Sequence, residues 1–382
     1  MEVAIMGAGM SGLSCAITLE RHGIIPTIFE KKDSVGDTFV HGEAMFHVFN
    51  SPVKDCLPYL SEKYHINLKA LDEVDKLFVH SKDNIGTIDG KIGYLNVRGR
   101  HKNSYESQLE EQVKCNINFN STYKYEELCK DFDYVVLATG DGEYASQLGN
   151  YRCDLTYSIK GATIQGEFIT SNPHVWFNYE ILPKGYAFLI PFSKKEANLV
   201  IAYPEYPNNM KLDINEIWKN FYILACNNLD QTFRITDSFQ IRKYMIGICN
   251  KPKINNTYFV GNCFGAISPG LGFGQYTSIL TGIYAAYDIC GLETYGELAK
   301  PLFENYNHSL VLRRFLNNLT DDDLDFLIKN LDNKITDQLV DKACSSNSSI
   351  DLLQMVTPIM RLWNNYKKFK RDRKSTRLNS SH

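Results

Sequence analysis

The chain has 382 residues, enough for two or three domains, and its 44% hydrophobic and 22% charged residues are typical of globular proteins. A net charge of −3 does not favour a nucleic-acid partner. Ten scattered cysteines without a Cys-x-x-Cys pair favour neither a metal site nor a disulfide framework. We find no signal peptide and no apolar run of about 18 residues, and therefore expect a cytoplasmic location.

The first 30 residues predict a strand, a glycine-rich turn and a helix. The apolar run 3–6 leads into Gly7, Gly9 and Gly12, which fit the G-x-G-x-x-G fingerprint of dinucleotide binding. Glu30 follows a second apolar run, where an acid accepts hydrogen bonds from ribose and disfavours a 2′-phosphate. The fingerprint leaves both NAD and FAD open. The predicted cofactor-binding residues here are Gly7, Gly9, Met10, Ser11, Gly12 and Glu30.

A second glycine-rich segment lies between a strand-like run at 256–260 and a helical pattern at 276–290. Its glycines stand at positions 261, 265, 270, 272 and 274. So many glycines predict a backbone that lies directly against a flat ligand, with a helix N-terminus aimed at it. The alternative is a tight loop between core elements.

This second segment resembles the second FAD motif of the flavoprotein hydroxylase superfamily and, within it, of the geranylgeranyl reductase family. Gly261-Asn262, Pro269 and Gly272-Phe273-Gly274 stand where the family has Gly-Asp, Pro and Gly-Glu-Gly. The resemblance implies FAD as the cofactor. Asn262 would keep one hydrogen bond to the ribityl chain without the charge, so we expect Asn262→Asp to bind FAD at least as well.

Two further stretches are similar to the same family. His41-Gly42-Glu43-Ala44 stands where the reductases have Cys-Gly-Glu-Gly, so the resemblance places the His41 imidazole facing the flavin. We predict that His41 is catalytic, as a proton donor or as an imidazolium beside reduced flavin. The run 183–191 is similar to Tyr-x-Trp-x-Phe-Pro, which lines the substrate cavity of the family. The alternative for this run is a plain buried strand pair.

The resemblance implies further FAD contacts, including one from Arg98 and one from the backbone at Tyr123. The cofactor-binding residues that it adds are Lys31, His41, Gly42, Ala44, Arg98, Tyr123, Gly261, Asn262, Gly272, Gly274 and Gln275. The substrate-cavity residues that it implies are Tyr186, Phe188 and Pro191.

These placements predict an α/β fold: a Rossmann-like FAD-binding domain, an inserted antiparallel β-sheet substrate domain and a C-terminal helical segment. The FAD-binding domain would combine 1–40, 91–150 and 255–295, and the substrate domain 41–90 and 151–254. Helices are expected within 296–371, over 311–319, 322–331 and 350–369, with Thr320 as an N-cap. Residues 372–382 resemble sequencing-adapter read-through, the alternative being a genuine basic tail.

The favoured function is reduction of carbon–carbon double bonds in an isoprenoid or other apolar substrate, with NAD(P)H or a ferredoxin-like protein as electron donor. The aromatic and basic run 363–371 suggests peripheral contact with a membrane surface, where a lipid substrate would reside. A flavin monooxygenase is the first alternative, and Asp141-Gly142 partly matches its motif. A flavin-binding protein without catalysis is the second.

Overall fold

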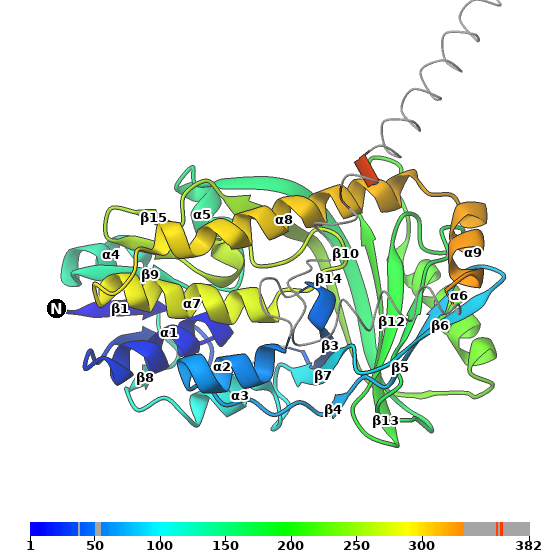
Figure 1. Ribbon diagram of the computed structural model, residues 1–382, viewed down its shortest axis with the longest axis horizontal. Helices are drawn as coiled ribbons and strands as arrows, with labels where there is room; N and C mark the ends of the chain where they lie inside the picture. The colour runs from blue at the N-terminus through cyan, green and yellow to red at the C-terminus, as the bar shows by residue number, and fades with distance from the viewer. Residues whose placement is uncertain (37–38, 50–54, 332–356, 358–359, 362–382) are drawn as a thin grey trace, which may run out of the picture.

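The computed structural model describes residues 1–36, 39–49, 55–331, 357 and 360–361. Its strands form sheets of six, seven and three strands. The six-stranded sheet lies at one end of an elongated molecule and the seven-stranded sheet at the other, with the three-stranded sheet between them (Figure 1). The predicted helix over 350–369 and the basic run 363–371 fall largely or wholly outside the described residues.

The six-stranded sheet has the order β15-β16-β9-β1-β2-β8. Its strands are β1 (Val3–Met6), β2 (Thr27–Phe29), β8 (Ile117–Asn118), β9 (Tyr134–Leu137), β15 (Lys253–Ile254) and β16 (Thr257–Phe259). All neighbours are parallel except β15 and β16. Continuous apolar runs suit such strands because helices cover parallel sheets on both faces. The predicted Rossmann-like architecture is confirmed.

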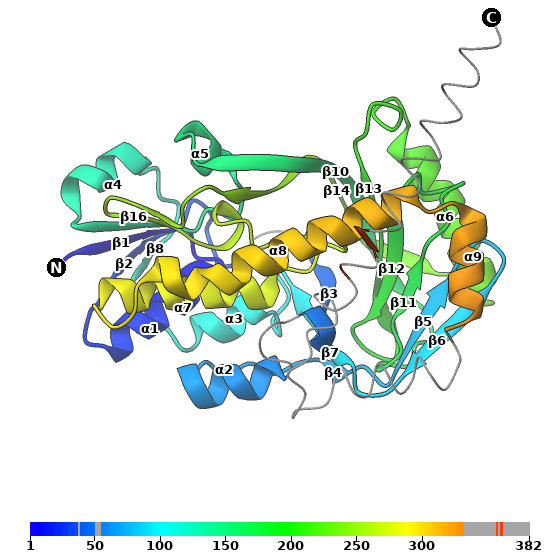
Figure 2. The same ribbon diagram turned by 45° about the horizontal axis from the view of Figure 1, so that its top comes forward.

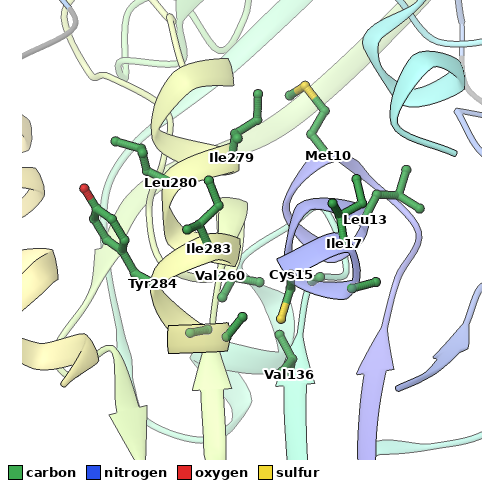
Figure 3. Close-up of a cluster of buried hydrophobic side chains, with 14 of the residues drawn as sticks. Met10, Leu13, Cys15, Ile17, Val136, Val260, Ile279, Leu280, Ile283 and Tyr284 are labelled. Atoms are coloured by element: carbon green, nitrogen blue, oxygen red, sulfur yellow. The ribbon is translucent and has the colours of Figure 1, made fainter. Parts of the chain in front are cut away.

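Two helices of this domain begin at the two glycine motifs. They are α1 (Met10–Arg21) and α7 (Gln275–Ile289). A Cβ atom on Gly282 would lie 2.1 Å from the Ser11 carbonyl oxygen, so only glycine permits this close crossing. Figure 3 shows Leu13 of α1 and Ile283 of α7 together over the sheet. The shorter helices are α2 (Cys56–Tyr64), α3 (Tyr105–Glu110), α4 (Tyr125–Asp131) and α5 (Glu143–Gln147).

The seven-stranded sheet has the order β14-β10-β13-β12-β11-β5-β6. Its strands are β5 (Lys76–His80), β6 (Ile85–Asp89), β10 (Tyr151–Gln165), β11 (His174–Trp176), β12 (Tyr186–Pro191), β13 (Glu196–Pro204) and β14 (Arg234–Cys249). Every pairing is antiparallel except β11 with β5. The predicted antiparallel sheet is therefore present.

The sheet is apolar on both faces. Successive side chains along a strand point to opposite faces, and each face packs against a different part of the protein. On β12, Ala187 and Leu189 pack toward α6 (Ile214–Asn228), while Phe188 and Ile190 face the opposite way. Helix α6 itself was not expected, since 151–254 was predicted as strands. Its buried positions recur with helical spacing, which is the signal that reveals it: Ile214, Ile217, Trp218, Phe221 and Ala225.

A three-stranded sheet and two more helices complete the described fold. The sheet has the order β3-β7-β4, with β3 (His41–Phe46), β4 (Asp72–Glu73) and β7 (Gly93–Arg98). Helix α8 (Tyr295–Asn318) starts well before the predicted residue 311 and runs from the six-stranded to the seven-stranded sheet in both views (Figures 1 and 2). Thr320 caps α9 (Asp321–Lys329), as predicted. Short 3₁₀ turns are η1 (His47–Phe49) and η2 (Gly261–Cys263).

The division into domains stays a proposal, because β7 from the predicted FAD-binding segments pairs with β3 and β4 from the predicted substrate segments. Among the described helices, none is both long and apolar enough to cross a membrane.

Candidate functional site

A cavity of about 810 Å³ extends from the first glycine motif to the inner face of the seven-stranded sheet. Its wall includes Gly9 and Glu30 at the six-stranded sheet, Gly272 in the second glycine motif, and Phe188 and Ile159 on the seven-stranded sheet. The cavity therefore joins a polar, glycine-lined end to an apolar end. Its volume is in the range of ligand sites in proteins.

The three glycines of the first motif have different structural roles. A Cβ on Gly7 would lie 2.2 Å from the Ala138 carbonyl oxygen, and one on Gly12 would lie 2.1 Å from the Gly7 carbonyl oxygen. Both are thus required by packing of the chain itself. A Cβ on Gly9 would meet no atom within 4 Å. Gly9 is the N-cap of α1, and the open space beside it is where a pyrophosphate would approach the helix N-terminus.

Glu30 stands at the end of β2 and closes this loop. Its Oε2 accepts a hydrogen bond of 2.8 Å from the Ala8 amide, and its Oε1 accepts one of 2.9 Å from the Lys32 amide. The carboxylate is fixed at the cavity wall, and its remaining lone pairs can accept hydrogen bonds from ribose hydroxyls. This arrangement fits the predicted ribose contact.

The second glycine motif lies directly against the first. Gly261 has φ +59°, and a Cβ there would be 2.5 Å from the Ser11 Oγ. Gly272, with φ +81°, leaves room for the Tyr186 hydroxyl. The prediction that the whole run faces a ligand is wrong for Gly265 and Gly270. Gly265 packs on the Gly247 carbonyl and Gly270 packs on α8, both away from this cavity.

Asn262 is held by hydrogen bonds that its side chain donates. Its Nδ2 donates to the Gly140 carbonyl at 2.7 Å and to the Tyr244 hydroxyl at 3.1 Å. The amide thereby links η2 to the turn after β9 and to β14. An amide can make both donations and a carboxylate cannot.

A largely buried ion-pair cluster lies on the cavity wall. Arg98 Nη1 is 3.0 Å from Glu43 Oε2, and Arg98 Nε donates to Glu106 Oε1 at 2.8 Å. Glu43 Oε1 also accepts from the Gly274 amide at 3.3 Å. Burial raises the pKa of Glu43, although Arg98 opposes this shift. Glu106 Oε2 is buried without a hydrogen-bond partner. Arg98 is therefore anchored by two carboxylates at the cavity surface.

His41 lies on the wall beside this cluster, at the start of β3. Its Nδ1 is 3.5 Å from the Phe39 carbonyl oxygen. Burial, and next the positive charge of Arg98, lower the pKa of His41 to about 3. The imidazole is thus neutral at neutral pH in the ligand-free cavity, which disfavours the predicted imidazolium form.

Most of the predicted site residues meet on this one wall. They are Gly9, Met10, Ser11, Glu30, Lys31, His41, Gly42, Ala44, Arg98, Gly261, Asn262, Gly272, Gly274, Tyr186 and Phe188.

Some predicted residues lie elsewhere. Gly7 and Gly12 act through packing. The Gln275 side chain is buried and paired with Asn96. Half-exposed Tyr123 packs at a tilt against Phe29 outside the cavity, and its predicted adenine contact stays a prediction. Pro191 is buried but off the cavity wall, where Ile190 lies instead.

Several wall residues were missed because they come from the two long strands of the large sheet. Tyr157 and Ile159 lie on β10, and Phe239, Ile241 and Tyr244 lie on β14. Apolar residues at every second position of 155–159 were the available signal for β10. On β14 the alternation breaks at Lys243, which has φ +55°, where the register shifts against β10.

Comparison with known proteins supports a dinucleotide-binding fold. A family model described as an NAD(P)-binding Rossmann-like domain matches residues 5–53. No protein of curated function matches the sequence.

Solved structures match nearly the whole chain at low identity. A geranylgeranyl bacteriochlorophyll reductase-like protein from Thermoplasma acidophilum is 14% identical, with a TM-score of 0.69 over 94% of this chain and 98% of that one. A variant of the flavin-dependent brominase Bmp2 is 12% identical, with a TM-score of 0.65 over 97% and 99%. Aklavinone-11 hydroxylase, solved with FAD and aklavinone, is 12% identical, with a TM-score of 0.56 over 86% and 70%. At these identities the likeness establishes a common fold.

Proposed function

We propose that this protein is an FAD-dependent oxidoreductase. The observation that carries the proposal is the single cavity, which joins both glycine motifs and Glu30 to an apolar pocket on the large sheet. The open space beside Gly9 fits a pyrophosphate, and Glu30 fits a ribose. Structures with the same fold include flavin-dependent enzymes, one of them solved with FAD.

The reaction we propose is reduction of a carbon–carbon double bond in an isoprenoid or similar apolar substrate. Bound reduced FAD would supply the hydride. The chain would hold the substrate against the inner face of the large sheet and exclude water there. Apolar side chains from β12, β10 and β14 support this role, among them Phe188, Ile159 and Phe239. NAD(P)H or a ferredoxin-like protein is the proposed electron donor.

His41 is the proposed proton donor for the carbon that does not receive hydride. With its pKa lowered to about 3 in the ligand-free cavity, the neutral ring would act as a relay, in which one ring nitrogen gives its proton to the carbon while the other takes up a proton that solvent supplies. We expect His41→Ala to keep FAD binding and to slow turnover. Unchanged turnover at saturating FAD would limit His41 to a binding role.

The proposal is tested by purifying the protein and recording its absorbance spectrum. We expect a yellow protein that releases FAD on denaturation, because no covalent link is predicted. The FAD-loaded protein is then reduced with dithionite and incubated with geranylgeranyl lipids, and the mass of the lipids is measured. A mass gain of two hydrogens per reduced bond supports the reductase. A preparation that cannot be reconstituted with FAD overturns it.

A flavin monooxygenase is the second candidate. It is favoured by the hydroxylase among the structural relatives and by Asp141, which lies on the cavity wall. The same incubation with NAD(P)H and oxygen separates the two functions, because a monooxygenase adds one oxygen to its substrate and a reductase adds hydrogen.

A further inference from the structure

Arg313, on α8, is a fully buried cation beside the apolar end of the cavity. Its side chain is 1% exposed. Its Nη1 donates to the Tyr157 hydroxyl at 3.0 Å, and its Nη2 donates to the Lys184 carbonyl at 2.9 Å. Its Nε is buried without a partner. Within the part of the chain that the structure describes, no carboxylate lies within ion-pair distance of this guanidinium.

A buried charge without a counter-ion is costly, and proteins keep one when something else balances it. Arg313 does not escape this cost by losing its proton. Burial lowers the pKa of Arg313, but nearby phenols such as Tyr157 and Tyr179 raise it, and the net shift is upward. The guanidinium therefore stays charged. Its field is directed at the Tyr157 oxygen, which accepts its hydrogen bond.

Tyr157 connects this charge to the cavity. It is 3% exposed and belongs to the cavity wall. Burial raises its pKa, so it keeps its proton at neutral pH although Arg313 opposes the shift. Its oxygen already accepts from Arg313, and no hydrogen bond donated by its own hydroxyl is found among the described residues. The phenol thus presents a donor, polarised by the guanidinium behind it, to whatever lies beside it.

Apolar side chains predominate on the cavity wall around Tyr157. Ala202, Ile246, Ile267 and Leu271 pack around Tyr157. The nearby Tyr186 hydroxyl is not free to serve a ligand, because it donates to the Leu271 carbonyl at 2.8 Å. Tyr157 is therefore a polar contact in a largely apolar pocket, an arrangement that fixes the orientation of a ligand.

We propose that the cavity takes an apolar molecule that carries one anionic oxygen, a carboxylate or a phenolate, and that Tyr157 binds this oxygen with Arg313 supplying the balancing charge. This inference deepens the proposed function, because it assigns a chemical class to the substrate of the same cavity. Tyr157 would thereby set the position of the double bond along the cavity, since the charged end of the substrate is fixed.

Matched ligands test the proposal directly. Geranylgeranic acid and geranylgeraniol share one chain and differ at the terminal group, and 2-naphthoate and 2-naphthylmethanol form a shorter aromatic pair. Binding is measured by equilibrium dialysis at pH 7, below the micelle concentration, with and without FAD. We expect one acid at least to bind roughly tenfold more tightly than its alcohol, the effect of one hydrogen bond to a charged group.

Two variants locate the effect. Tyr157→Phe removes the donor and keeps the ring, so the acid should lose about tenfold in affinity, and the alcohol, whose neutral oxygen accepts a weaker hydrogen bond, should lose clearly less. Tyr186→Phe is the matched control from the same pocket and should keep the acid preference, because its hydroxyl is bonded to the chain. Arg313→Met should lose the preference too, and circular dichroism verifies that each variant is folded.

Equal binding of acid and alcohol in both pairs would overturn the proposal, as would a Tyr157→Phe variant that keeps the preference. The proposed function fails separately. If FAD does not bind while the acid preference persists, the oxidoreductase assignment is wrong and the anion site stands.

Discussion

Gly9 and Gly12 are the second and third glycines of the same sequence fingerprint, and their surroundings differ. We expect Gly9→Val to abolish FAD binding, because its side chain would enter the open space that we propose for the pyrophosphate. The fold should persist, since a Cβ there meets no protein atom and the residue has φ −83°. Fluorescence titration of FAD and a thermal melt measure the two effects.

Gly12→Val is the matched control for this prediction. Its Cβ would lie 2.1 Å from the Gly7 carbonyl oxygen, so we expect a lowered melting temperature or failure to fold. If Gly9→Val binds FAD as the parent does, the first glycine motif does not hold the pyrophosphate.

At Asn262 the hydrogen bonds favour a different expectation from the one that the family resemblance gives. Asn262→Asp would place a carboxylate against the Gly140 carbonyl oxygen and remove the donor that now lies 2.7 Å from it. We therefore expect FAD affinity to fall about tenfold, rather than to hold or improve. Titration of FAD into the apo variant measures this, with Asn262→Ala separating loss of the donor from charge repulsion. Affinity equal to the parent in Asn262→Asp would restore the family-based expectation.

His41 makes stability depend on pH. In the FAD-free protein its pKa is lowered to about 3 by burial and then by Arg98, whereas an unfolded histidine titrates near pH ~6.5. The unfolded state therefore takes up the proton first, and the free energy of unfolding falls as pH drops through this window. We expect His41→Gln to make that dependence shallower, by up to about 1.4 kcal/mol per pH unit. Urea melts at pH 7, 5.5 and 4 measure it, and parallel curves for parent and variant would contradict the prediction.

At the scale of elements, α6 shows how a helix stabilises the sheet from the face opposite the cavity. Phe221 is fully buried and packs edge-on against Trp176 of β11, with ring centroids 5.4 Å apart. We expect Phe221→Ala to lower the free energy of unfolding by about 3–5 kcal/mol. Ile223, half exposed on the same helix, is the control, and Ile223→Ala should change it by less than about 1 kcal/mol. Equal effects in denaturant melts would show that α6 is not packed as described.

The β-bulge in β14 is the element that sequence reasoning could not place. Strict alternation would put Ile241 and Lys243 on one face. The register instead shifts between the pairs Tyr157–Tyr244 and Ile159–Ile241, so Ile241 and Tyr244 both reach the cavity. A bulge depends on how two strands pair, and these strands are separated by about 70 residues of chain.

For the whole molecule, FAD binding should raise stability. The predicted FAD contacts come from the turn after β1, from β3 and β7, and from the segment before α7, and these contacts form together only in the folded chain. A ligand that binds only the native state stabilises it by about 2.7 kcal/mol at one hundred times its dissociation constant. We expect FAD to raise the melting temperature of the parent protein, measured by circular dichroism, and to leave the melting temperature of Gly9→Val unchanged. An unchanged melting temperature of the parent protein at saturating FAD would contradict this prediction.

The sequence by itself determined the nucleotide-binding end of this protein. Its strand, glycine turn and helix, and the acid at Glu30, are neighbours in the chain, so local physical rules suffice to predict them. The capped start of α9 at Thr320 is local in the same way. Tertiary structure alone decided the rest of the site. It packed Gly265 and Gly270 against chain rather than ligand, lowered the pKa of His41 and brought Arg313 to Tyr157, 156 residues away. Burial, charge and contact at a site depend on what the fold places there, and a single sequence shows only what lies next along the chain.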